Sequence, residues 1–171
     1  MSSMKEIVIS NFKGVQRGTD FILKAVPKDK LDYAPTKDVQ QKLGDLARHI
    51  AVLSYTGTLF VEGGNKERPN PDQMKKILAD KFGSDLANNN YSAVFNKACE
   101  HFLNFYSKKS DDELVKGTFT NFINTSPTPF LKGFLSIEDH LVQHRGTLFA
   151  YLRALNVPVT MKQYFGMEEL H

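Results

Sequence analysis

Hydrophobic residues recur along most of the chain at intervals of three or four positions, with polar residues between them. This is the spacing of amphipathic α-helices, in which the apolar positions form one stripe. The pattern predicts four long helices, at about residues 4–25, 37–60, 91–107 and 130–155. No segment shows the paired alternation of apolar and polar positions that indicates a sheet.

Segments rich in turn-forming residues separate these helices. Two prolines and several charges make residues 27–35 a connection, after which Thr36 is the expected N-cap of the second helix. Residues 62–72 form an expected surface loop, and Asp72 is placed to cap a short helix that ends near Phe82.

The link between the third and fourth long helices is the longest irregular stretch. Ser110 begins a sequence typical of a capped helical turn, and residues 117–128 mix apolar side chains with Thr, Asn, Ser and Pro. We expect a long crossover that also contains Ile123 and whose aromatic residues, Phe119 and Phe122, pack on the core. Asn156 and Pro158 are expected to stop the last helix.

Size and composition add a fold class to this pattern. The chain has 171 residues, of which 41% are hydrophobic and 24% charged, the mixture of a folded globular protein. The length suits one domain over residues 1–171. Four long amphipathic segments in one short domain predict an all-α antiparallel four-helix bundle with a longer crossover before the last helix.

The net charge and the cysteine content indicate which partners and which cellular compartment to expect. The formal net charge is only +3, and basic residues such as Lys28, Lys75 and Lys108 are dispersed among acids, which argues against a nucleic-acid partner. The single Cys99 excludes an internal disulfide and suits a reducing compartment. Because no apolar run approaches the length of a signal core or a membrane span, we expect a cytoplasmic protein with no membrane partner.

Histidines in the predicted apolar stripes carry the candidate chemistry. A rotation of about 100° per residue places His140 and His144 among the apolar positions of the last helix, one turn apart on one face. Turning two imidazoles toward the core is costly unless they have partners. This spacing allows one helix to supply two ligands to a metal ion.

A third ligand is expected from another helix. His49 borders the buried face of the second helix, between Leu46 and Leu53, and an antiparallel bundle can bring it opposite the pair. His101 borders the core face of the third helix and is a possible fourth ligand, although we interpret it as a boundary residue. His171, the last residue, is expected to be solvated.

Two parts of the chain together resemble the DinB/YfiT-like superfamily. The first is the His140-x3-His144 pair followed by Arg-Gly, a Tyr-Leu-Arg stretch and a proline. The second is the opening helix, the segment Leu31-Asp-Tyr-Ala-Pro, and a second helix that carries His49. Two positions depart from the common pattern, because Tyr33 stands where Trp is frequent and Thr147 where Gln is frequent.

The resemblance implies a four-helix bundle, often a homodimer, with a divalent metal ion, usually nickel or zinc, on His49, His140 and His144. Members with known activity include thiol-dependent transferases and isomerases, and others are described as metal-dependent hydrolases. It therefore implies a small-molecule substrate, which for the transferases includes a low-molecular-weight thiol.

The chemistry expected of three histidines leaves several functions open. A tetrahedral ion with three protein ligands keeps one position for a water, which favours hydrolysis, or for a thiol, which favours S-transfer. No carboxylate is placed by spacing as a general base, although Asp45 lies one turn before His49 and could orient its ring. The alternative is a noncatalytic bundle that binds a metal or another ligand.

Overall fold

The chain folds into a bundle of four long helices, as the hydrophobic pattern predicts. The structure is a computed structural model that describes residues 2–36, 41–64 and 67–167. The long helices are α1 (Met4–Lys24), α2 (Leu43–Gly63), α4 (Tyr91–Ser107) and α6 (Phe130–Ala154). None of the helices in the described ranges is long and apolar enough to cross a membrane.

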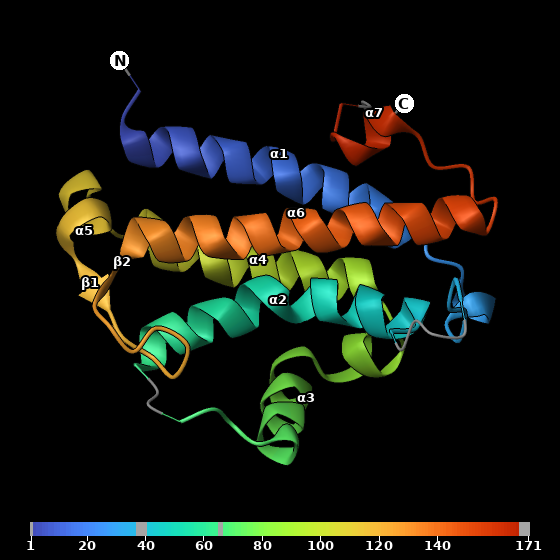
Figure 1. Cartoon of the computed structure of the whole chain (residues 1–171), viewed down its shortest axis with the longest axis horizontal. Coiled ribbons are helices and arrows are strands. Elements are labelled where there is room, and N and C mark those ends of the chain that lie inside the picture. Colours follow the sequence, from blue (N-terminus) through green and yellow to red (C-terminus); the bar gives the residue numbers. More distant parts are fainter. Residues whose placement is uncertain (1, 37–40, 65–66, 168–171) are drawn as a thin grey trace.

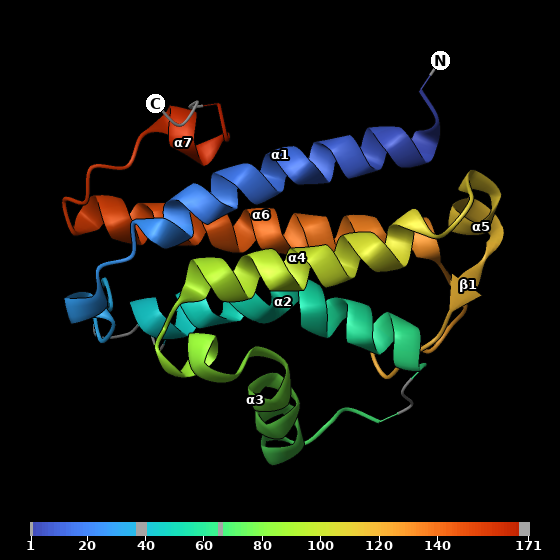
Figure 2. The ribbon, with the colours of Figure 1, turned by 180° about the vertical axis from the view of Figure 1, so that it is seen from behind.

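Figure 1 and Figure 2 show how the four helices are arranged. α1 and α2 each pack against both α4 and α6, so α1 and α2 lie at opposite corners of the bundle. The colours show that α1 runs antiparallel to α4 and α2 runs antiparallel to α6, whereas α1 and α6 share one direction and α2 and α4 share the other (Figure 1). The antiparallel pair that matters for the site is α2 with α6.

Stacked aromatic rings fill the centre of the bundle. Phe12 of α1 and Phe102 of α4 lie 4.3 Å apart between ring centroids, and Phe134 of α6 lies 4.8 Å from Phe102. All three side chains are fully buried. Burial of such rings stabilises the fold by area removed from water and by ring contacts, and it fixes the helix that carries the histidine pair.

The second long helix begins later than the sequence predicts. Thr36 does not cap it, since α2 starts at Leu43 after an N-cap residue, Lys42, that makes no side-chain capping bond. Carbonyl groups of the preceding segment replace the cap: Tyr33 accepts a hydrogen bond from the Leu43 amide at 2.8 Å, and Leu31 accepts one from Gly44 at 2.9 Å. That segment contains the short 3-10 helix Lys28–Lys30.

The segment between α2 and α4 contains a longer helix than expected, α3 (Pro71–Ala87). Asn70 caps this helix through a capping box with Gln73, and Asp72 instead lies in the first turn. The helix passes the predicted end at Phe82 across a kink at Gly83, whose φ of 51° is costly for residues with a side chain. α3 lies beneath the bundle in Figure 1, beside the outer face of α2.

The crossover before α6 has more structure than its composition indicates. Ser110 caps α5 (Asp111–Lys116) as predicted, and two short antiparallel strands follow, β1 (Thr118–Phe119) and β2 (Thr128–Pro129). The expectation of a buried crossover holds for Phe119, which is 7% exposed. Phe122, in the loop between the strands, packs its ring edge-on against Phe60 of α2, and the next residue, Ile123, is 66% exposed.

The last helix ends where predicted, and the chain then folds back over α1. Asn156 adopts a positive φ of 58° after α6. The chain continues to α7 (Met161–Tyr164), which packs against α1 (Figure 1). The buried Arg145 of α6 connects α6 to both α1 and α7. It donates a hydrogen bond to the Val15 carbonyl of α1 at 3.3 Å and stacks on the Tyr164 ring of α7.

Candidate metal centre

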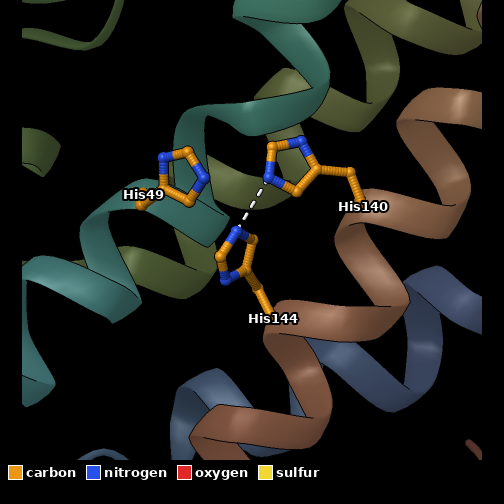
Figure 3. Close-up of side chains that lie close together, drawn as sticks. All are labelled: His49, His140 and His144. Carbon is orange, nitrogen blue, oxygen red and sulfur yellow. Dashed lines mark hydrogen bonds between the residues drawn. The ribbon is translucent and has the colours of Figure 1, made fainter. Parts of the chain in front are cut away.

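Three histidines from two helices converge at the seam between α2 and α6. Each of His49, His140 and His144 offers a ring nitrogen, and these three atoms lie within 4.8 Å of one another. The Nε2 atoms of His140 and His144 are 2.8 Å apart, with one N–H donating to the other ring. Figure 3 shows His49 reaching from α2 toward the two rings carried by α6.

Helix geometry and close packing both position these rings. His140 and His144 are one turn apart and therefore leave α6 on the same side. His49 faces them because α2 lies against α6, and Gly57 lets the two helices approach. A Cβ atom at Gly57 would come within 2.8 Å of the Ile137 side chain, closer than side-chain carbons pack.

The cluster lies at the edge of the bundle rather than in its core. His49 and His144 are half-buried, and His140 is exposed. The apolar stripe of α6 is wide, and its central positions, Leu141 and Leu148, fill the interior. The three rings are therefore accessible from solvent, which the helical wheel alone did not indicate.

Burial and proximity both favour the neutral forms of His49 and His144. Loss of water, followed by the neighbouring His144 and His140, lowers the pKa of His49 from 6.5 to about 4. Burial and the adjacent His140 also lower the pKa of His144. A neutral imidazole keeps a lone pair for a metal ion, so His49 is a competent ligand at pH 7.

The spacing of the rings suits a shared metal ion. Two nitrogens bound to one tetrahedral zinc ion at about 2.0–2.1 Å lie roughly 3.4 Å apart. The observed separations, from 2.8 Å for one pair to at most 4.8 Å, bracket that value, so small ring rotations are sufficient. Within the described ranges no fourth His, Cys, Asp or Glu side chain joins the cluster.

Comparison with known proteins supports the fold. Neither a protein-family model nor a curated protein matches the sequence. The structure resembles the crystal structure of YjoA, a DinB-like protein from Bacillus subtilis, with a TM-score of 0.61 and 15% identity over 90% of this chain and 96% of that one. The chain has a DinB-like fold. The fold resemblance expected from the two histidine segments is confirmed.

His101 lies apart from the three-histidine cluster, in agreement with its interpretation from the sequence as a boundary residue. Its Nε2 atom lies 3.0 Å from a carboxylate oxygen of Glu62, and its ring packs edge-on against Tyr55. It is not part of the three-histidine cluster. His171 lies outside the described residues.

Asp45 and Cys99 are not part of the three-histidine cluster. Asp45 is exposed, and no hydrogen bond joins it to His49 among the described residues. Cys99 is fully buried in α4, where burial raises the pKa of its thiol and its Sγ donates weakly to Ser54 Oγ. A buried neutral thiol of this kind is not a nucleophile.

A groove next to His49 is the part of the site that sequence reasoning missed. It encloses about 1010 Å³ between the outer face of α2, α3, and the loops near residues 68–70 and 122–123. Arg48, Arg68 and Lys75 line it. In the sequence Lys75 is only one of the dispersed basic residues, and the position of α3 brings it beside Arg48 and Arg68.

Proposed function

We propose that this chain is a metal-dependent enzyme in which His49, His140 and His144 hold one divalent ion, nickel or zinc, for hydrolysis or thiol S-transfer. The observation that carries the proposal is the convergence of three imidazole nitrogens within 4.8 Å from two helices far apart in sequence. Such a cluster costs stability through the loss of hydration unless a ligand satisfies it.

The number of donors favours catalysis over a structural role. Structural zinc sites are closed by four protein ligands, whereas catalytic sites have three and keep one position open. The cluster offers three histidines and no further ligating side chain among the described residues. The exposure of His140 leaves a path for a fourth ligand from solvent.

The residues of the chain then have distinct tasks. His49 supplies a neutral lone pair because its pKa is about 4, and α6 fixes the other two rings one turn apart. A divalent ion with an open position acts as a Lewis acid and lowers the pKa of a water or thiol. The groove beside His49 is placed to hold the organic part of a substrate.

Metal analysis tests the ligand set. We expect about one zinc or nickel ion per chain after dialysis at pH 7, a strong loss of the ion in His144→Ala, and retention in His101→Ala. His101 is the matched control because it is also a half-buried helix histidine, but it pairs with Glu62. Helical circular dichroism checks that the variants fold. Equal retention in wild type and His144→Ala contradicts the assignment.

Activity assays separate the two reactions and the noncatalytic alternative. The loaded protein is tested with a chromogenic ester for hydrolysis, and with a small thiol and an electrophile for S-transfer. We expect one of the two reactions, and we expect it to be lost in His144→Ala. A retained ion with neither reaction favours a metal-binding bundle without catalysis.

A further inference from the structure

The groove beside His49 is long and follows one face of α2. His49, Val52, Thr56 and Phe60 all line it, at intervals of three or four residues. At a rise of about 1.5 Å per residue, the stretch from His49 to Phe60 spans about 16 Å. The groove therefore includes His49, one of the three clustered histidines, and extends along α2 to the loop that carries Phe122 and Ile123.

Apolar side chains from three separate segments form the wall of this groove. Phe60 and Phe122 meet edge to face with ring centroids 4.8 Å apart. Ile123, 66% exposed, extends the apolar surface into solvent. Burial of such apolar surface by the apolar part of a ligand is favourable. The wall residues are Val52, Phe60, Met74, Leu78, Phe122 and Ile123.

Positive charge accompanies this apolar wall. Three basic residues line the groove: Arg48 of α2, Arg68 of the loop before α3, and Lys75 of α3. The lining contains one acidic residue, Asp45. None of the three cations forms an ion pair with any residue that the structure describes, and Arg48 makes only a long hydrogen bond of 3.4 Å, to Asn89. By contrast, Lys76, the neighbour of Lys75, pairs with Asp80 at 2.6 Å.

We propose that the groove binds a small amphipathic anion. The apolar body of the ligand lies on the wall formed by α2, α3 and the 122–123 loop, and its carboxylate or phosphate group pairs with Arg48, Arg68 and Lys75. The volume of about 1010 Å³ is of the size that takes a single small molecule. His49 is common to the groove and the histidine cluster, so the amphipathic anion is also the expected substrate of the metal centre. That part of the proposal rests on the proposed function.

Octanoate is a suitable probe, because it joins a carboxylate to an alkyl chain. It is titrated into the ¹⁵N-labelled full-length protein, after chelator treatment and again after zinc loading, and amide shifts are followed by NMR. We expect saturable shifts along the α2 face from His49 to Phe60 and in α3 in both forms. Acetate tests the head group alone, octanol the chain alone, and octylamine the opposite charge.

Two pairs of variants test the charge and the wall separately. Lys75→Gln should weaken octanoate binding about two- to fivefold, the range of one solvent-exposed ion pair, while Lys76→Gln leaves it unchanged. Met74→Gln should weaken both octanoate and octanol, whereas Met161→Gln, on the exposed surface of α7, should weaken neither. The proposal is overturned by the absence of saturable shifts, by equal affinity for octanoate and octylamine, or by equal effects of the two lysine variants.

The design separates failure of the groove from failure of the metal centre. Octanoate binding to the chelator-treated protein does not need an ion, and ion retention is measured without octanoate. Octanoate binding without retention of the metal ion supports the groove and contradicts the proposed enzyme. Retention of the ion without octanoate binding supports the metal centre and overturns the groove proposal. In the nickel-loaded protein, paramagnetic broadening of bound octanoate protons reports nearness to the centre. Its absence while both ligands are bound overturns the link between groove and centre.

Discussion

Proton competition at the three-histidine centre offers a quantitative test of its electrostatics. An imidazole binds a metal ion only when neutral, so each histidine that is protonated at the working pH weakens binding. A ring with the ordinary pKa of 6.5 costs about tenfold in affinity when the pH falls from 7.5 to 5.5. Three ordinary rings together would cost about 1000-fold.

The structure removes His49 from this competition. Burial and the adjacent His144 and His140 hold its pKa at about 4, so the ring is still neutral at pH 5.5. Without His49 the limit of 1000-fold falls to about 100-fold, and the lowered pKa of His144 makes the expected loss smaller. We therefore predict a loss of less than about 100-fold, with fewer than two protons released per ion at pH 5.5.

Zinc affinity is measured by competition with a chromophoric chelator at both pH values. Calorimetry in two buffers with different ionisation enthalpies counts the released protons. His101→Ala should give the same pH dependence as the wild type, since His101 lies outside the cluster. A loss near 1000-fold, or three protons released at pH 5.5, would refute the pKa shift of His49 and the packing that causes it.

Three further predictions concern stability and assembly. Because the pKa of His49 is lower in the folded chain, the unfolded chain takes up this proton at a higher pH than the folded chain does. The free energy of unfolding of the metal-free protein should therefore fall by about 1 kcal/mol between pH 6.5 and 4, after allowance for the partial exposure of the ring. Denaturant melts of His49→Gln should lack this loss. Gly18→Ala should lower the free energy of unfolding by about 1–3 kcal/mol, because the new Cβ would overlap the Tyr164 carbonyl. The variant should also expose α7 to limited proteolysis, and unchanged proteolysis would contradict this. Light scattering should report a homodimer with twice the 19.3 kDa mass of one chain, a proposal that a monomer mass at micromolar concentration would overturn.

The sequence alone determined three of the four long helices and the relation between two of the three histidines. Hydrophobic spacing located α1, α4 and α6 to within a residue or two, since burial of one face is a local and periodic requirement. Helix geometry likewise fixed the relation of His140 to His144, because two residues four positions apart share a face in any α-helix. Ser110 was also identified as a cap, since its bonds reach only three residues along the chain.

Features that depend on distant residues were decided by the tertiary structure. α2 begins at Leu43 because carbonyls of residues 31 and 33 fold back onto its first amides, a contact that a search for N-cap side chains does not detect. His101 is paired with Glu62, 39 positions away, and this pairing depends on the packing of α2 against α4.

The complete site is likewise a product of packing. The spacing of one helix can supply two imidazoles, but the third arrives only because α2 lies against α6. The groove requires in addition that α3 turn its Met74 and Lys75 toward α2. Local periodicity states which face of a helix is buried, whereas the partner of that face is chosen by the free energy of the whole core.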